Sequence, residues 1–429
     1  MNEQAPSVEQ RFEESTPATL DSWSRQDTTW MLGLFGTAIG AGTLFLPINA
    51  GLGGFWPLLI LAVLAFPMTY YAHRGLTRFV LSGRSGDITD VVEEHFGLKA
   101  GALITVLYFF AIFPILLIYS VALTNTVGSF MEHQLHMTPP PRAILSFVLI
   151  LGLLAIVRCG EQATVKVMSL LVYPFIVALA LLALYLVPHW NGGILDSATS
   201  LPTGSAFLHT LWLAIPVMVF SFNHSPIISA FAVDQKRRYG EHADQRSGQI
   251  LARAHLLMVA MVLFFVFSCV LTLSSAQLAE AKAQNLSILS YLANHFSNPA
   301  IAFAAPLIAF IAIAKSFLGH YIGASEGLKG IIAKAGLRPG AKALDRVVAA
   351  LMLVVCWVVA TLNPSILGMI ESLGGPIIAA LLFLMPMYAI RRVPSMRKYS
   401  GAMSNVFVVV LGLIAMSSVL YSVVGSLLD

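Results

Sequence analysis

Two stretches inside long apolar runs contain residue types that break a helix and can bind a small polar molecule. The first holds Gly36, Gly40 and Gly42, with Pro47 five residues further on. The second, residues 220–226, places serine, asparagine, histidine and serine side chains shortly before Pro226. Closely spaced glycines and proline disfavour a continuous helix, so each stretch predicts two half-helices that meet inside a membrane. The alternatives are close helix packing on the glycines and a simple proline kink.

Such breaks predict a site for a molecule with both a negative and a positive group. A half-helix that starts near Gly42 would point free N–H groups and a positive dipole end at a carboxylate. Half-helices that end near Ala38 and Phe220 would expose carbonyl oxygens, which suit an ammonium group. An α-amino acid carries both groups. The predicted substrate-binding residues are Thr37, Ala38, Ile39, Gly40, Ala41, Gly42, Thr43, Phe220, Ser221, Phe222, Asn223, His224 and Ser225.

Three ionisable residues at membrane depth are candidates for proton coupling. Lys315 follows the uncharged run 300–314, where a charge costs at least ~2.5 kcal/mol, so a function is the default hypothesis; the alternative is that its long chain reaches the interface. Glu371 precedes a Gly-Gly-Pro sequence and is either a proton relay or a structural partner of that break. His224 could titrate near neutral pH or hydrogen-bond a substrate hydroxyl while neutral.

The composition identifies the elements that must hold these residues. Only 11% of the 429 residues are charged and 57% are hydrophobic, with a mean hydropathy of +0.80. Soluble domains have about 25% charged residues, so a soluble fold is excluded and an all-α polytopic membrane protein is predicted. Eleven apolar runs could cross a membrane, near residues 30–51, 55–80, 101–130, 142–158, 164–188, 206–233, 253–274, 300–323, 347–363, 365–390 and 404–427.

The basic residues predict an orientation for these runs. With the N-terminus in the cytoplasm, the cytoplasmic segments hold all but three of the 25 lysines and arginines. Arg142 and Lys282 fall on the other side, and Lys315 falls inside a run. This asymmetry alternates over every loop, as the positive-inside rule requires. It predicts a cytoplasmic N-terminus and a periplasmic C-terminus.

The two breaks lie at matching places in two successive sets of five runs. Interrupted helices at corresponding positions of two halves point to an inverted-repeat transporter. We therefore expect a polar tail over residues 1–27 and a ten-helix transport core over 28–390. Residues 391–429 would form a cytoplasmic loop and an eleventh helix.

Several long motifs resemble the bacterial hydroxy and aromatic amino acid permease family. They are WMLGLFGTAIGAGTLFLPINAGLGG, LTRFVLSG, VVEEHFG, MVFSFNHSPIISAF, KSFLGHYIGASEG, LNPSILGMIESLGGPIIA and MPMYAIRRVPSMRKYSG. The likeness extends from about Trp23 to the C-terminus. It implies eleven helices in a bacterial inner membrane and a LeuT-type repeat of five plus five helices, with helices 1 and 6 broken and one extra helix.

The resemblance also implies proton-coupled import of L-serine. The alternative is a symporter for threonine and serine or another small neutral amino acid, driven by protons or sodium. In sodium-coupled members of the wider LeuT-like group, a sodium ion lies between helices one and eight. By analogy, the Lys315 ammonium would take that place, and its protonation would hold the two helices together.

Other functional classes lack their motifs. The sequence has no His-Glu-x-x-His motif, no cysteine pair at metal-ligand spacing and no P-loop, so an enzyme or an ATP-driven pump is not expected. A channel or a receptor is a less favoured interpretation of the sequence than a carrier. We expect no cofactor, no metal and no nucleic-acid partner, and a lipid bilayer around the chain. The sequence leaves the oligomeric state open.

Overall fold

The computed structural model describes residues 22–84, 86, 88–159, 161–198, 204–296, 298–336 and 340–428, and in these residues the regular elements are all helical. Most of the predicted tail, residues 1–21, lies outside them. The first half contains α1 (Arg25–Ala38), α2 (Ala41–Leu52), α3 (Phe55–Ser82), α4 (Ile88–Phe96), α5 (Leu98–His133), α6 (Arg142–Arg158) and α7 (Glu161–Leu186). The middle contains α8 (Ser205–Ser221), α9 (Ile228–Tyr239), α10 (Ala243–Thr272), α11 (Ser275–Ala283), α12 (Ile288–His295) and α13 (Pro299–Lys334). The last part contains α14 (Ala341–Leu362), α15 (Ile366–Met369), α16 (Gly375–Ala379), α17 (Met385–Arg392) and α18 (Met403–Leu428).

Every predicted apolar run is mainly helical in the described residues, and the runs 30–51 and 206–233 are each interrupted once. Seven of the resulting segments are long and apolar enough to cross a membrane, or eight if the bent pair α1 and α2 counts as one span. One of the seven covers α8, α9 and α10 together, from Phe207 to Thr272. The chain is therefore a multi-pass membrane protein, and the count of eleven spans stays a prediction.

The first run is broken where the glycines predicted it. Helix α1 ends at Ala38, α2 begins at Ala41, and the two axes differ in direction by 57°. Helix α1 begins at Arg25, ahead of the predicted start near Trp30. The earlier start has a local cause, because Ser24 and Asp27 form a capping box that satisfies the first turn.

The second predicted break is also present. Helix α8 ends at Ser221, and a 3₁₀ turn, η4 (Ser225–Ile227), leads into α9. Pro226 lies in this turn, where its missing N–H costs no helical hydrogen bond. Both breaks therefore exist as real interruptions rather than as packed glycines or a kink.

The run from α15 to α17 is irregular in another way. Two π-helical turns, η6 (Ile370–Gly374) and η7 (Ala380–Leu384), alternate with short α-helical pieces. Single π turns inside helices often mark functional places. Glu371 lies in the first of them.

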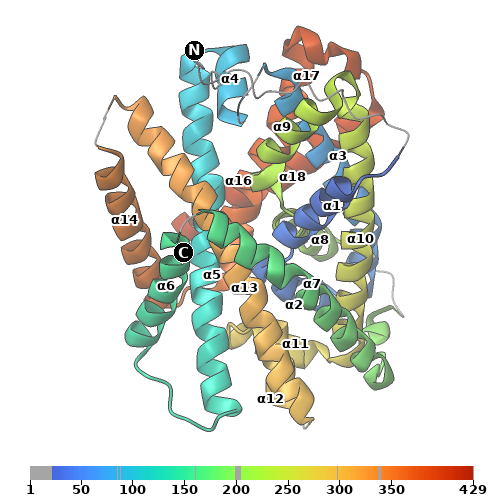
Figure 1. Ribbon diagram of the computed structural model, residues 1–429. Helices are drawn as coiled ribbons and strands as arrows, with labels where there is room; N and C mark the ends of the chain where they lie inside the picture. The colour runs from blue at the N-terminus through green and yellow to red at the C-terminus, as the bar shows by residue number, and fades with distance from the viewer. Residues whose placement is uncertain are drawn as a thin grey trace.

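The helices form one bundle with two distinct ends (Figure 1). Helices α4, α9 and α17 lie at one end, and the short helices α11 and α12 lie at the other (Figure 1). The long helices α5 and α13 pack against each other through the middle of the bundle. Both carry many buried residues, and both pass close to the break between α1 and α2.

Candidate functional site

The carboxyl end of α1 meets α13 at a buried lysine. Lys315 is 1% exposed, and its Nζ donates a hydrogen bond to the carbonyl oxygen of Gly36. The same Nζ lies 5.2 Å from the centroid of the Phe175 ring on α7. Gly36 is in the last turn of α1, where carbonyl groups lack helical partners and the helix dipole is negative. The ammonium group is therefore placed where a cation is stabilised.

A second contact from α13 lies one residue further along. Ser316 Oγ donates to the carbonyl of Ile39, at 3.1 Å, in the gap between α1 and α2. A Cβ on Gly40 would lie 2.6 Å from Ser316 Oγ and 2.7 Å from the Tyr119 hydroxyl of α5. Glycine is thus required at position 40, because α5 and α13 both bring a hydroxyl group up to the backbone.

The two breaks are joined directly to each other. Thr43 Oγ1 on α2 lies 3.4 Å from the carbonyl oxygen of Ser221 at the end of α8, to which it donates. A Cβ on Gly42 would lie 2.6 Å from the Phe220 ring and 2.9 Å from Ser221 Cα. The predicted residues of the first and second breaks are therefore brought into one place.

The first turn of α2 has no side-chain cap. Gly40 is its N-cap and supplies no side-chain hydrogen bond to the first turn. Uncapped N–H groups at a helix start, aided by the dipole, bind carboxylates. Ala41, Gly42 and Thr43 form this first turn and are fully buried or nearly so.

The polar residues of the second break are buried and partly engaged. Ser221 Oγ donates to Val217 O at 2.7 Å, within its own helix. Asn223, which is 4% exposed, accepts a hydrogen bond from the Ser225 backbone N–H at 3.1 Å and so shapes the turn into α9. Of these side chains, Asn223 also carries an amide donor that could serve a substrate hydroxyl.

The His224 side chain packs against two neighbouring helices. Its ring stacks on His73 of α3, with centroids 3.6 Å apart and planes 8° apart. Its backbone N–H points to His73 Nε2 at 3.3 Å. The side chain is therefore packed against α3 and α10.

Glu371 links the π turn to the far half of the first broken run. Its Oε1 accepts a hydrogen bond from Asn49 Nδ2 of α2 at 3.0 Å. The Phe220 ring lies beside the same turn, because a Cβ on Gly374 would come within 2.8 Å of it. Glu371 thus ties α2 to η6 and does not reach the Lys315 contact.

A cavity of about 350 Å³ opens below the second break, at the end of the bundle that holds α4 and α9. Pro226 and Ser229 line it on one side, and Thr105, Tyr108 and Gly327 line it on α5 and α13. The cavity therefore lies between the second break and the helices α5 and α13.

Close to the same end, the start of α1 is tied to α9. The Asp27 carboxylate is fully buried and accepts hydrogen bonds from the Tyr239 hydroxyl at 2.8 and 3.0 Å. Trp30 Nε1 donates to Asp234 at 2.7 Å. These bonds tie the first half of the first broken run, α1, to the second half of the second broken run, α9.

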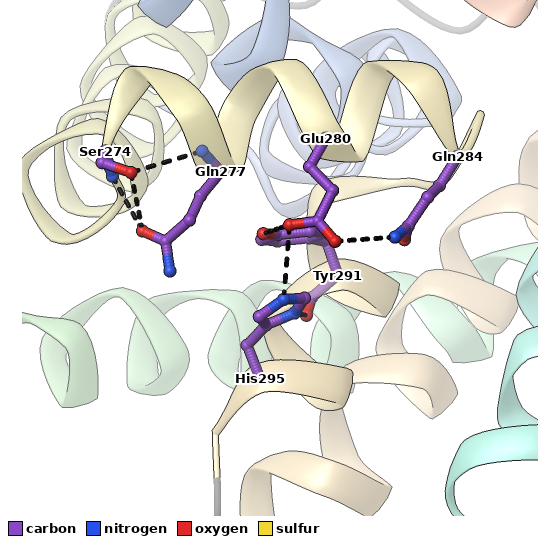
Figure 2. Close-up of polar contacts among 6 residues, drawn as sticks. All are labelled: Ser274, Gln277, Glu280, Gln284, Tyr291 and His295. Atoms are coloured by element: carbon purple, nitrogen blue, oxygen red, sulfur yellow. Dashed lines mark hydrogen bonds and ion pairs between the residues drawn. The ribbon is translucent and has the colours of Figure 1, made fainter.

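At the opposite end, α11 and α12 form a cap over α2 (Figure 1). Figure 2 shows Glu280 of α11 between Gln284 and the two aromatic side chains of α12. The Tyr291 hydroxyl donates to Glu280 at 2.7 Å, and His295 Nε2 lies 3.7 Å from the same carboxylate. Burial and the bond to Glu280 raise the pKa of the Tyr291 hydroxyl, which therefore stays a donor at physiological pH. The bonds hold the two cap helices together.

The structure places Gly42 and Thr43 of the first break against Phe220 and Ser221 of the second, and it adds residues that sequence reasoning missed. Ser316, Phe175 and His73 were not predicted. Ser316 could have been found from its position beside Lys315. The others lie on unbroken helices, where nothing in the local sequence distinguishes them from ordinary core residues.

Comparison with known proteins gives one family. Residues 29–420 match the model of the tryptophan/tyrosine permease family. The chain is 66% identical to the serine transporter SdaC of Escherichia coli over 421 residues, which covers 95% of this chain and 98% of that protein.

Two solved structures share the fold at low identity. MhsT in complex with L-phenylalanine has a TM-score of 0.56 at 16% identity, with 93% of this chain and 97% of that chain covered. A manganese transporter variant of Eremococcus coleocola has a TM-score of 0.64 at 14% identity, with 95% and 88% covered. These structures show that the chain has a LeuT-type fold.

Proposed function

The chain belongs to the tryptophan/tyrosine permease family, and we propose on that basis that it imports L-serine by proton symport across a bacterial inner membrane. It is a transporter and not an enzyme. The serine assignment is supported by the 66% identity to a serine transporter over almost the whole of both chains. Proton coupling is supported by one contact, the hydrogen bond from Lys315 to Gly36 O.

The breaks supply the two ends of the amino acid with partners. The serine carboxylate would dock on the first-turn N–H groups of α2, near Gly42. The ammonium group would meet carbonyl oxygens at the ends of α1 and α8. The serine hydroxyl would form a hydrogen bond with the buried Asn223 side chain, because a site distinguishes a hydroxyl by a polar group that pairs with it. The full proposed set is residues 37–43 and 220–225.

Lys315 would act as the coupling group. When protonated, its ammonium holds α13 on the negative end of α1; when it loses its proton, it no longer attracts that carbonyl as strongly. A release of this contact would let α1 move away from α13. A sodium ion at the same place is disfavoured, because two cations a few ångströms apart repel each other.

Glu371 and His224 are further candidates on the proton path. Glu371 is partly buried and bonded to Asn49, so a change in its charge would alter the link between α2 and η6. His224 lies in the second break itself. We propose that neither replaces Lys315, because neither touches the end of α1 in the described residues.

The proposal includes the topology. Eleven spans in two sets of five plus one would place residues 1–27 and the cavity by Pro226 in the cytoplasm, and the α11–α12 cap in the periplasm. The core would be residues 28–390, and residues 391–429 would give the last loop and helix. A cavity at one end and a cap at the other are the arrangement expected of a carrier whose substrate path opens to the cytoplasm.

Uptake of labelled serine into proteoliposomes tests the function. A proton gradient and a sodium gradient should be imposed separately, with threonine as a competitor. We expect serine to accumulate with the proton gradient alone. Accumulation that follows only sodium would refute the coupling, and a stronger response to threonine than to serine would refute the substrate.

A further inference from the structure

Three buried histidines from three helices meet beside the second break. His73 lies on α3, His224 lies between α8 and α9, and His255 lies on α10; each is at most 1% exposed. The His224 ring centroid lies 4.8 Å from that of His255, and His73 lies 5.2 Å from His255. Their possible ligand atoms all lie within 4.8 Å of one another. We call these residues the histidine trio.

The hydrogen bonds of the trio show which ring nitrogen of each histidine carries a hydrogen. Each Nδ1 lies next to a backbone carbonyl: 2.8 Å from Thr69 O for His73, 3.2 Å from Phe222 O for His224, and 2.7 Å from Leu251 O for His255. A carbonyl only accepts, so each Nδ1 carries the hydrogen. His73 Nε2 faces the His224 backbone N–H and is therefore an acceptor without a proton.

The remaining two Nε2 atoms differ from each other. His255 Nε2 lies 3.4 Å from His73 Nδ1, which already carries a hydrogen, so His255 Nε2 is also an acceptor. His224 Nε2 is buried and has no partner in the part of the chain that the structure describes. All three rings are thus neutral here, and His224 Nε2 is the one ring nitrogen of the trio with its lone pair unused.

The arrangement fits a proton better than a metal ion. A metal binds about 2.0–2.1 Å from nitrogen along the lone pair, which lies in the ring plane. The stacked rings of His73 and His224 have planes only 8° apart, so their lone pairs run side by side and do not converge on one point. A proton needs only the single lone pair of His224.

The neighbouring charged and titratable groups are engaged elsewhere. Tyr70 presents its ring edge to His255, and its hydroxyl is bonded to Arg74. The charged side chains on the helices packed around the trio also have partners of their own. Asp244 of α10 pairs with Arg74, and Asp27 of α1 accepts a hydrogen bond from Tyr239. Asp234 of α9 accepts a hydrogen bond from Trp30, and Lys315 of α13 donates one to Gly36. Apart from Tyr70, none of these groups contacts a ring of the trio among the described residues. A proton on His224 would therefore have no counter-charge.

We propose that the histidine trio is a second proton site of the transport cycle. The proton binds at His224 Nε2, and its binding releases the second break from α3 and α10. The inference rests on the proposed proton symport. A hydronium ion gives its proton to the Nε2 lone pair and leaves as water, so no other bond is made or broken. The new N–H would be buried without an acceptor and beside two other imidazoles, which is costly. The protonated state is consequently stable only when the stack opens and the ring reaches water.

Serine counterflow in proteoliposomes, with equal pH on both sides, tests this coupling. For the unaltered chain we expect counterflow to be roughly fivefold faster at about pH 5.5 than at about pH 7.5, a range that spans histidine titration. His224→Asn keeps an N–H for Phe222 O but has no second nitrogen. Whatever its rate at about pH 7.5, this variant should show an acid stimulation, the ratio of its own rates at about pH 5.5 and about pH 7.5, of less than about twofold. His133→Asn is the matched control, since His133 Nδ1 bonds its own helix in the same way, 3.1 Å from Ser129 O, and should keep the full stimulation.

A second measurement does not depend on a substituted protein. Hydrogen–deuterium exchange of residues 220–232 in the unaltered chain, corrected for the intrinsic effect of pH, should be faster at the acid pH. Equal corrected exchange at both pH values would overturn the inference, as would full acid stimulation in His224→Asn. Inhibition by zinc that a chelator reverses, and that His224→Asn abolishes, would reassign the trio as a metal site and also overturn it.

The same experiments separate this inference from the proposed function. If the unaltered chain shows no serine counterflow at any pH, the proposed function fails and the trio inference fails with it. If counterflow is present and His224→Asn responds to acid like the unaltered chain, only the trio inference fails.

Discussion

Lys315 Nζ donates a hydrogen bond to the carbonyl oxygen of Gly36, across 279 positions of sequence. The contact joins α13 to the last turn of α1 within the bundle, directly beside the first break. It explains why a buried lysine is tolerated in an apolar helix, where a charge is costly: the ammonium meets the negative end of α1 and a carbonyl in its last turn, where helical partners are lacking.

Lys315→Met should abolish serine accumulation driven by a proton gradient. Methionine fills similar space but can neither donate to Gly36 O nor change its charge. We expect accumulation to fall at least about tenfold, which corresponds to about 1.4 kcal/mol. Lys329→Met is the matched control on the same helix, because Lys329 pairs with Asp345 at 2.6 Å near the end of α13 and should transport normally. Normal accumulation in Lys315→Met would contradict the coupling role.

Gly42→Ala should impair transport with little change in the amount of folded protein. The new Cβ would come within 2.6 Å of the Phe220 ring and 2.9 Å of Ser221 Cα, so it would push the two breaks apart. We expect serine uptake to fall by about tenfold or more, since misplacing groups by about 1 Å can cost that much. Gly33→Ala, on α1, has no atom within 4 Å of the added carbon and should leave uptake unchanged. Similar uptake for both variants would show that the breaks need no close approach.

Asn223→Ala should lower serine transport more than it lowers stability. The change removes both the hydrogen bond to the Ser225 N–H and the amide proposed to read the hydroxyl. Asn298→Ala serves as the control, because Asn298 accepts from the Ala300 N–H in the same local geometry, at 2.9 Å, at the start of α13. The ratio of uptake to folded protein should fall several-fold only for Asn223→Ala. Equal ratios for the two variants would give Asn223 a folding role alone.

Tyr239→Phe should destabilise the link between α1 and α9. It leaves the buried Asp27 carboxylate without the two hydrogen bonds from the tyrosine hydroxyl. The loss should be about 1–3 kcal/mol, the cost of an unsatisfied buried acceptor, and thermal unfolding in detergent should occur at a lower temperature. Tyr388→Phe, at a residue that is 55% exposed, should melt like the unaltered chain. An unchanged melting temperature for Tyr239→Phe would show that Asp27 is satisfied in another way.

The sequence predicted features that depend on local chemistry. The apolar runs, the breaks at residues 36–43 and 220–226, and the isolated Lys315 can all be read from residue types and spacing. Glycine and proline act on the backbone at their own positions, so the ends of α1 and α8 were predictable to within a few residues. The count of spans depends on a membrane and stays a prediction.

Tertiary structure decided which groups meet at those places. His224 was predicted to serve the substrate or a proton, but only the packing of α3 and α10 places His73 and His255 against its ring. In the same way, Ser316 and Tyr119 reach Gly40 because α13 and α5 are rotated to face the gap. The physical reason is that a helix-breaking preference is a property of a few adjacent residues. The partner of a buried side chain instead depends on how separate helices rotate and pack, and no single segment of the sequence contains that information.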